Sequence, residues 1–276
     1  MSDKTDPAPA VVPHVGTYRR LLPVSLERLY ENALDWEHLP WLHSTSFCDI
    51  ECIDAGEWGW LALAGVPPVE QRIQLKLELR LDRDCRRWIT RTLDGPTRGA
   101  EIWTHAFEIG EKQTDIVVDF FVPGTPLEQV EAVGDFYKAV YQRLYDEDVS
   151  MMVERQRQLD SNADRNGATA DSIPLGRFDE IRERLPLTVE QGGLRYRVAE
   201  IDGELLAYSV LCPHNLGPLE NSDIINGIIE CPWHGYKFDI LSGQAVDGHR
   251  CRLATGPRVI VDPVTSEVVL EALSRR

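Results

Sequence analysis

The chain has 276 residues, of which 43% are hydrophobic and 27% charged, a length and composition typical of a globular protein with room for two domains. It contains no uninterrupted apolar run near the ~18–20 residues that a membrane-spanning helix needs, so we expect no membrane insertion. A formal net charge of -16, with no compensating cluster of lysines or arginines, makes nucleic acid an unexpected partner.

The first sixteen residues, 1–16, are rich in Pro and Ala and lack the apolar core of a signal peptide. We interpret them as a flexible leader. Two of the six cysteines stand in metal-ligand spacing with histidines and the others are scattered, which does not indicate a disulfide framework. The expected location is therefore a reducing compartment, the cytoplasm.

The first half of the chain alternates between helical and strand patterns. Ser25 is positioned to cap a helix through the sequence LERLYENALDWEHL, which Pro40 should end or kink. Period-two alternation then indicates half-buried antiparallel strands. These strands are expected at 72–81, 88–92, 101–107 and 115–122. Apolar residues at spacings of three and four next predict a long helix from about Leu127 to Leu159.

A polar stretch of small residues separates the two halves. We place a linker at 161–172, because this segment has almost nothing to bury. Beyond it the predicted strands are short, and Asn226-Gly227 between two Ile-Ile pairs indicates a hairpin with a type I′ turn. Residues 173–276 are thus expected to form a small all-β domain.

Four metal ligands stand in a C-x-H, spacer, C-x2-H pattern in this second domain. They are Cys212, His214, Cys231 and His234, and sixteen residues separate the two pairs. Two thiolates and two imidazoles suit a two-iron, two-sulfur cluster with a potential of roughly -150 to +300 mV. A structural zinc site also takes two cysteines and two histidines, but zinc fingers pair Cys with Cys and His with His.

The segments CPHNLGPL and CPWHGYKFDILSGQ resemble the Rieske family, and the resemblance extends over about 175–272. It implies a Rieske [2Fe-2S] cluster on the four ligands, with Pro213, Pro232 and Gly235 in the tight ligand loops. Respiratory Rieske proteins carry an additional cysteine pair near the cluster. The corresponding loops here have Leu216-Gly217-Pro218 and Pro232-Trp233, so the likeness is to oxygenases and their ferredoxins.

The order helix, curved sheet and long helix over residues 17–160 resembles the helix-grip fold of START-like and Bet v 1-like domains. The expected fold class is therefore α+β, with an N-terminal helix-grip domain at 17–160 followed by a small all-β Rieske domain at 173–276. Trp36, Trp41, Trp103 and Phe120 are able to line an apolar cavity in such a domain, although aromatic residues in a core more often simply pack.

A second constellation lies in the first domain, in the segment Asp35-Trp-Glu-His38-Leu-Pro-Trp-Leu-His43. It resembles the iron-binding segment of Rieske non-haem iron oxygenases, D-x2-H-x4-H, with Asn32 at a position where the family often has asparagine. The resemblance implies a mononuclear Fe(II) held by His38, His43 and a carboxylate from the long helix. Asp148 aligns with that carboxylate, and Asp146 is the reserve candidate.

Each of these residues also has an ordinary interpretation. His38 and His43 could be plain helix and loop histidines, Asp148 a solvated acid, and Asp35 a partner of Arg28 or Arg143. The family resemblance instead implies that Asp35 hydrogen-bonds an iron ligand and a cluster histidine, by motif position His234, and so relays electrons. A carboxylate in that place also fixes imidazole tautomers.

The resemblance implies a terminal oxygenase that hydroxylates or oxidatively demethylates a small apolar or aromatic substrate with dioxygen. The implied partners are a ferredoxin, a flavin-dependent reductase or both, and the implied assembly is a homotrimer. Family members usually place the Rieske domain first, and here the order is reversed. The alternative is a ferredoxin-like carrier fused to a START-like module that binds a hydrophobic ligand without chemistry; a redox or iron sensor is a third option.

Overall fold

The computed structural model describes residues 12–71, 73–164, 171–254 and 256–272. The chain divides into two compact units, residues 1–153 and 154–276, and each is described by itself. The expected α+β class is confirmed, because the first unit combines a sheet with helices and the second, beyond the end of the helix at Val130–Asp164, consists mainly of short strands and loops. The predicted domain bounds at 17–160 and 173–276 remain predictions.

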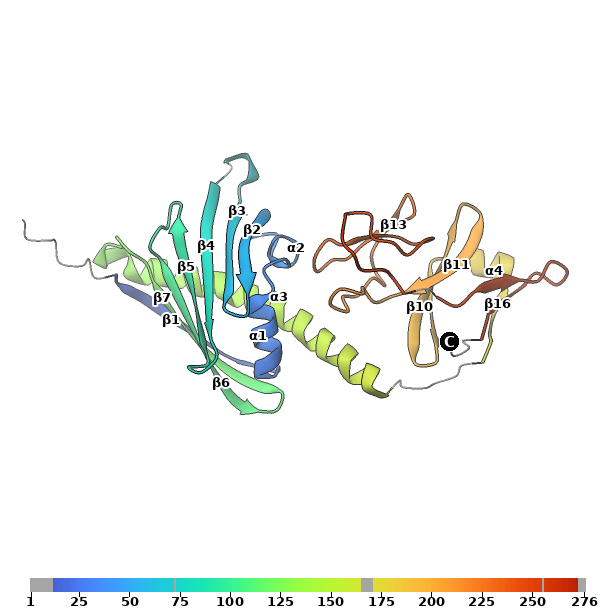
Figure 1. Ribbon diagram of the computed structural model, residues 1–276, viewed down its shortest axis with the longest axis horizontal. Helices are drawn as coiled ribbons and strands as arrows, with labels where there is room; N and C mark the ends of the chain where they lie inside the picture. Colours follow the sequence, from blue (N-terminus) through green and yellow to red (C-terminus); the bar gives the residue numbers. More distant parts are fainter. Residues whose placement is uncertain (1–11, 72, 165–170, 255, 273–276) are drawn as a thin grey trace, which may run out of the picture. The chain divides into compact units, whose positions relative to one another are not determined.

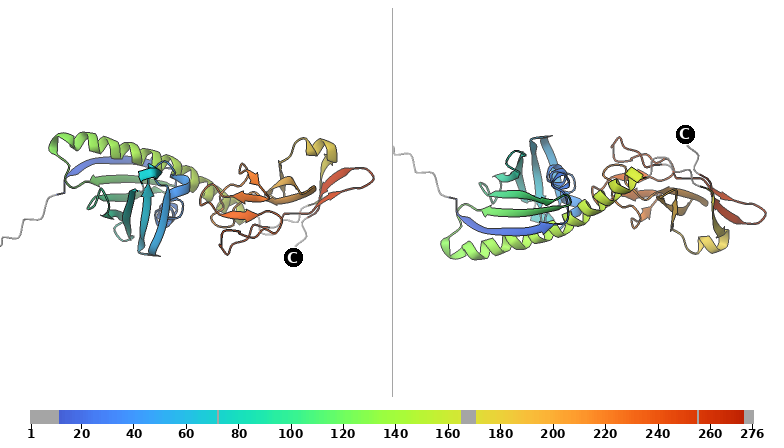
Figure 2. Two further views of the ribbon diagram at one scale, coloured as in Figure 1. Left: turned by 90° about the horizontal axis from the view of Figure 1, so that it is seen from above. Right: turned by 90° about the horizontal axis from the view of Figure 1, so that it is seen from below.

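The first unit is a seven-stranded antiparallel sheet in the order β1-β7-β6-β5-β4-β3-β2. Its strands are β1 (His14–Leu22), β2 (Asp49–Gly56), β3 (Gly59–Val66), β4 (Ile73–Asp82), β5 (Arg87–Asp94), β6 (Glu101–Gly110) and β7 (Gln113–Phe121). Helix α1 (Leu26–Leu34) and the short α2 (Leu39–Leu42) precede β2, and α3 (Val130–Asp164) follows β7; two short 3-10 turns are found at Val69–Gln71 and Leu127–Gln129. The N-terminal part of α3 lies along the sheet, which is the helix-grip arrangement (Figures 1 and 2).

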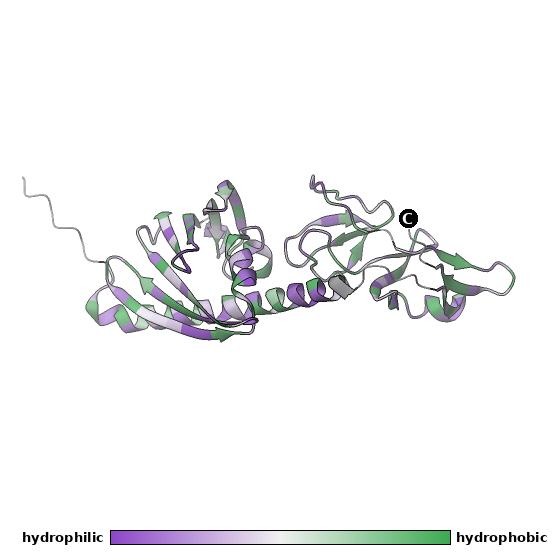
Figure 3. Cartoon of the chain, turned by 60° about the horizontal axis from the view of Figure 1, so that its bottom comes forward, coloured by the Kyte–Doolittle hydropathy of each residue, from purple (hydrophilic) through white to green (hydrophobic). Residues whose placement is uncertain are grey.

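The core of this unit lies between the sheet and the helices. Hydrophobic and hydrophilic residues alternate along the strands (Figure 3), so that one face of the sheet supplies apolar side chains. Leu22, Leu29, Ile116, Val118 and Phe120 are fully buried there. This alternation is the pattern from which β4 to β7 were predicted.

Two sequence predictions at the start of the unit need correction. The helix that Ser25 caps ends at Leu34 rather than at Pro40, because the backbone of Asp35 leaves the helical region. The Ser25 side chain does accept the N–H of Arg28, as predicted. Pro40 instead lies in the first turn of α2, where its missing N–H is harmless. Strand β1 begins at His14 and pairs with β7, so it overlaps the last three residues of the leader predicted at 1–16; residues 1–11 lie outside the described residues.

The long helix was predicted at 127–159 and is found at Val130–Asp164. It therefore occupies the first residues of the linker predicted at 161–172, and residues 165–170 lie outside the described residues. Across the described ranges, no helix combines the length and the apolar character that crossing a membrane requires.

The second unit contains three three-stranded antiparallel sheets. Their orders are β11-β10-β9, β12-β13-β14 and β15-β16-β8. The strands are β8 (Ile173–Arg177), β9 (Leu187–Gln191), β10 (Leu194–Ile201), β11 (Glu204–Ser209), β12 (Ile224–Ile225), β13 (Ile228–Glu230), β14 (Lys237–Asp239), β15 (Val259–Val261) and β16 (Glu267–Leu270). Within its described residues the unit also contains the C-terminal end of α3 and the short helix α4 (Phe178–Arg182).

The hairpin between β12 and β13 has the predicted turn. Asn226 and Gly227 both adopt positive φ angles, 53° and 76°, which is the requirement of a type I′ turn. The strand β13 that leaves this hairpin leads directly into Cys231. The turn therefore positions the second pair of predicted ligands.

Candidate metal centres

Two tight loops of the second unit carry the predicted cluster ligands. The first loop follows β11, and Cys212 N–H donates to the carbonyl of Gly217 at 2.8 Å while Leu216 N–H donates to Cys212 O at 3.0 Å. In the second loop, Cys231 N–H donates to Tyr236 O at 2.9 Å. Each pair of ligands thus sits in a turn that its own backbone closes.

The four side chains converge. Cys212 and Cys231 are buried, and the rings of His214 and His234 lie 4.5 Å apart between centroids, at 79° to one another. Gly217 faces the thiol of Cys231, and a Cβ atom at this position would stand 2.8 Å from that sulfur. Any residue larger than glycine at position 217 would therefore occupy the space beside the Cys231 sulfur.

The thiols of Cys212 and Cys231 are hydrogen-bonded to each other, and this contact shifts their pKa values in opposite directions. This contact and burial both raise the pKa of Cys212. The same contact, together with a hydrogen bond from His234, lowers the pKa of Cys231 to about 5 although burial opposes it. Two cysteine sulfurs with two imidazoles are the donor set of a Rieske cluster.

The second predicted centre lies in the first unit, at the two ends of α2. His38 is the N-cap and His43 the C-cap of this four-residue helix, and Asp148 faces both from α3. Oδ1 of Asp148 lies 3.1 Å from Nε2 of His43 and 3.4 Å from Nε2 of His38. One ligand atom from each of these three buried residues lies within 4.8 Å of the others.

Further polar side chains surround the three residues. Asn32 Nδ2 donates to Asp148 Oδ1 at 2.9 Å, and Nδ1 of His43 lies 2.6 Å from Oε2 of Glu147. Asp35 Oδ2 lies 3.6 Å from Nδ1 of His38. Both imidazoles therefore face a carboxylate on the side away from Asp148, an arrangement that orients metal-binding histidines.

The pKa values of His38 and Asp148 are both shifted by their neighbours. Burial alone would lower the pKa of His38, but the neighbouring Asp148 and Asp35 raise it from 6.5 to about 10. Burial would likewise raise the pKa of Asp148, but His38 and His43 hold it well below its usual range. Two imidazoles and one carboxylate are donor types that would suit Fe(II).

A cavity of about 120 Å³ adjoins this donor set. Its wall combines Trp60, Trp88, Leu77, Leu79, Phe47 and Leu144 with the phenols of Tyr141 and Tyr145. Burial raises the pKa of Tyr141, and the charge of Asp148 adds to the effect, so this phenol stays protonated. The space is thus apolar with a few hydrogen-bond donors near the carboxylate.

The comparisons with known proteins identify the second unit. The profile of the Rieske [2Fe-2S] domain matches residues 171–257. The ferredoxin component of the naphthalene 1,2-dioxygenase/salicylate 5-hydroxylase systems of Ralstonia sp. is 30% identical over 78 residues, which are 28% of this chain and 75% of that protein. The chain belongs to the Rieske [2Fe-2S] family.

Two other similarities are more limited. The oxygenase component of dicamba O-demethylase from Stenotrophomonas maltophilia is 42% identical over 38 residues, 14% of this chain and 11% of that protein. A solved structure from Thermus thermophilus, that of the protein TTHA0849, has a TM-score of 0.42 and 17% identity over 50% of this chain and 96% of its own. The helix-grip description of the first unit comes from its own strand order and from α3.

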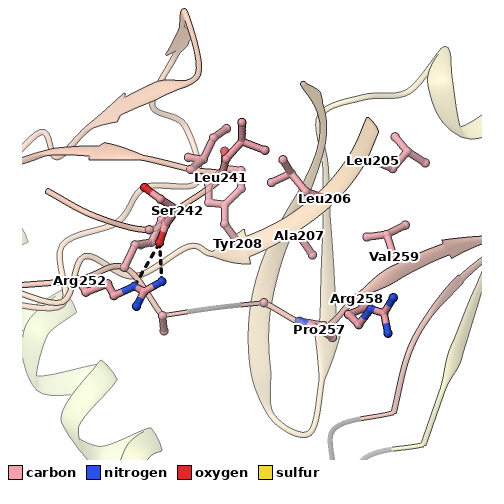
Figure 4. A pocket seen from close by; sticks show the side chains of 15 residues that line it. Leu205, Leu206, Ala207, Tyr208, Leu241, Ser242, Arg252, Pro257, Arg258 and Val259 are labelled. Atoms are coloured by element: carbon pink, nitrogen blue, oxygen red, sulfur yellow. Dashed lines mark hydrogen bonds between the residues drawn. The ribbon is translucent and has the colours of Figure 1, made fainter. Parts of the chain in front are cut away.

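The Rieske domain also has a surface cavity of about 290 Å³ between β11, the turn at 240–243 and the residues 252–254 and 256–259 (Figure 4). Leu205, Leu241 and Val259 line it together with Arg252, whose guanidinium donates to Ser242 O. None of the four predicted cluster ligands is among its described lining residues.

The structure brings the predicted ligands of each centre close together, and it adds neighbours that the sequence did not indicate. The reserve ligand Asp146 is turned away, is 55% exposed, and pairs with Arg20 at 2.6 Å. Arg28 pairs with Glu31, and Arg143 donates to Ser46, so the alternative partners of Asp35 are engaged elsewhere. Glu147 was missed, because the sequence does not say which of three successive acids faces the histidines. The aromatic side chains that line the cavity are Phe47, Trp60, Trp88, Tyr141 and Tyr145, and none of Trp36, Trp41, Trp103 and Phe120 is among its described lining residues.

Proposed function

We propose that the chain is the terminal component of a Rieske non-haem iron oxygenase with its catalytic unit first and its Rieske unit second. Its cluster, held by Cys212, His214, Cys231 and His234, accepts electrons from a ferredoxin, a flavin-dependent reductase or both. A mononuclear Fe(II), held by His38, His43 and Asp148, is the second centre. The product is a hydroxylated or oxidatively demethylated apolar compound.

One observation carries this proposal: in the first unit, Nε2 of His38 and Nε2 of His43 both approach Oδ1 of Asp148, and all three side chains are buried. A buried aspartate between two buried histidines costs folding free energy unless each charge is compensated. A structural role needs no cavity beside the carboxylate, whereas a metal centre that admits a small molecule does. The 120 Å³ space next to Asp148 therefore supports the catalytic interpretation.

Fe(II) bound by two histidines and one carboxylate supplies open coordination positions at which dioxygen can be activated. The residues of the chain hold and shield this centre. Asn32 donates to Oδ1 of Asp148 and so fixes the carboxylate, while Glu147 and Asp35 face the distal nitrogens of His43 and His38. Trp60, Trp88 and the leucines exclude water from the space that the substrate would enter.

Asp35 has a second proposed role in electron delivery. Its carboxylate lies beside His38, and its motif position pairs it with His234 of a Rieske unit in the functional assembly, which we propose to be a homotrimer. A carboxylate that accepts from two imidazole N–H groups connects the two metal centres by hydrogen bonds. Electrons would then pass from the cluster to the mononuclear iron through this link.

Metal and sulfide analysis of the purified, ferrous-reconstituted protein tests the proposal. We expect three irons and two acid-labile sulfides per chain, with the rhombic electron paramagnetic resonance signal of a reduced Rieske cluster. Two irons and two sulfides after reconstitution would rule out the mononuclear centre. Zinc without labile sulfide would rule out the cluster.

The second candidate function is an electron carrier fused to a module that binds a hydrophobic ligand without chemistry. The observation that favours it is the match to a ferredoxin component over most of that protein's length, against a short match to an oxygenase component. The same iron count separates the two functions, because the carrier needs only the two irons of its cluster.

A further inference from the structure

Three aromatic rings form a continuous stack in the Rieske unit. The rings of His214 and Tyr236 lie 4.3 Å apart at 8°, and those of Tyr236 and His249 lie 3.5 Å apart at 12°. Tyr236 is only 7% exposed, whereas the side chain of His249 is 39% exposed. The stack therefore leads from a proposed cluster ligand to the solvent.

Hydrogen bonds fix the backbone that carries His249, the outermost ring of the stack. The carboxylate of Asp247 accepts the N–H of Lys237 at 2.7 Å and the N–H of His249 at 3.3 Å, and it lies 3.9 Å from the imidazole Nε2 of His249. Val246 N–H donates to Lys237 O at 2.9 Å. The loop with His249 is thus bound to β14, which directly follows Tyr236.

The charge of this loop is opposite to that of the chain as a whole. Arg250 and Arg252 are both exposed and flank Cys251 just after His249. Arg252 is anchored, because its Nε and Nη2 donate to Ser242 O at 3.1 and 2.7 Å (Figure 4). On a protein with a net charge of -16, a small cationic surface beside a redox path favours the approach of an acidic partner there.

We propose that electrons enter the Rieske cluster through the stack His249, Tyr236 and His214, at a surface where an acidic redox protein docks against Arg250 and Arg252. This inference rests on the ligand assignment proposed above. Each transfer oxidises the reduced partner by one electron and reduces the cluster by one, and no covalent bond forms or breaks. The contacts between the stacked rings shorten the distance that the electron crosses between the partner's redox centre and the cluster. His249 is a positioning residue, because it lies at the end of the stack where the acidic partner would dock.

Stopped-flow reduction of the cluster-loaded full chain tests the route, with an acidic plant-type ferredoxin kept reduced by its own reductase as the electron donor. The second-order rate constant is read from the visible absorption of the cluster and expressed per cluster. We expect His249→Ala to lower it several-fold and His249→Phe, which keeps a flat ring in the stack, to retain most of it. Reduction by dithionite and the midpoint potential should be unchanged in both variants.

The docking surface is tested with Arg250→Glu against Arg177→Glu as the matched control. Arg177 is also exposed, but it lies in β8, in a sheet without proposed ligands. Charge reversal at Arg250 should lower the rate roughly tenfold at low ionic strength and much less at high salt, as expected of electrostatic steering. Arg177→Glu should have little effect.

The outcomes separate this inference from the function on which it rests. A wild-type rate in His249→Ala overturns the ring route, and equal effects of Arg250→Glu and Arg177→Glu overturn the docking surface. Both results require a normal cluster and leave the proposed function standing. A protein that assembles no cluster instead refutes the ligand assignment itself.

Discussion

Asn32 and Asp148, 116 residues apart in the sequence, are joined by a hydrogen bond of 2.9 Å from the amide nitrogen to Oδ1. The same oxygen faces both His38 and His43. The amide N–H and the two imidazoles therefore share one acceptor oxygen, and the amide adds a hydrogen bond that restrains the carboxylate. Substitution of Asn32, His38 or His43 should therefore change the position of the Asp148 carboxylate.

Replacement of His43 by alanine should remove the mononuclear iron and leave the cluster. The reason is the loss of one of three ligands from a site that has no other imidazole beyond His38 in its described lining. Iron should fall from three to two per chain with sulfide unchanged, measured on the purified variant. Full iron content would contradict the assignment of His43, and His105→Ala, in β6, is the control.

Glu147→Gln should weaken iron binding without abolishing it. The carboxylate of Glu147 lies 2.6 Å from Nδ1 of His43, and partners of this kind typically contribute about 10–100-fold in metal affinity. Competition with a chelator measures the change. Asp146→Asn is the control, since Asp146 pairs with Arg20 and should leave the affinity as it is; equal effects of both variants would disprove the role of Glu147.

At Fe(II) concentrations that saturate the mononuclear site, Asp35→Ala should leave both metal centres filled and interrupt the electron transfer between them. In single turnover, the reduced cluster of this variant should be reoxidised by dioxygen as slowly as that of His43→Ala. Visible absorption follows the reaction, and Asp119→Ala, which removes an acid that pairs with His14, should behave like the wild type. Reoxidation of Asp35→Ala at the wild-type rate would show that electrons take another path.

The metal-free protein should lose stability as the pH rises. The folded-state pKa of His38 is raised from 6.5 to about 10, so protonated His38 stabilises the fold fully below pH 6.5 and this contribution disappears as the pH passes through about 10. Thermal unfolding between these values, in the presence of a chelator, measures the decline. The slope should be smaller in His38→Gln, and an identical slope in this variant would rule out His38 as its source.

Gly217→Ala should impair cluster assembly. The added Cβ would stand 2.8 Å from the Cys231 sulfur and 3.1 Å from the Trp233 ring, and such overpacking typically costs about 1–3 kcal/mol. Iron and sulfide per chain and the visible spectrum of the cluster report the loss. Gly110→Ala, where the nearest atom would be 3.8 Å away, is the matched control. A fully loaded Gly217→Ala protein would show that the loop can yield.

The sequence allowed the strands β4 to β7, the long helix and the type I′ turn to be predicted, because each has a local periodicity or a pair of turn residues. It did not allow β1 to be placed, since the alternation of this strand carries Arg19 and Arg20 and begins within a Pro-rich segment. Metal-ligand spacing indicated the four cluster residues, and the resemblance to the iron-binding segment of Rieske oxygenases indicated His38 and His43. The contact between Glu147 and His43 depends on the rotation of α3 about its axis, which neighbouring acids do not reveal.

The two caps of α2 have a consequence for folding. A helix of four residues with no buried side chain is far too short to persist by itself. Iron bound by both His38 and His43 would tie its two ends together, so the amides of this turn should exchange slowly with deuterium only while the metal is bound. Loading of the centre and ordering of this turn would then be one cooperative event.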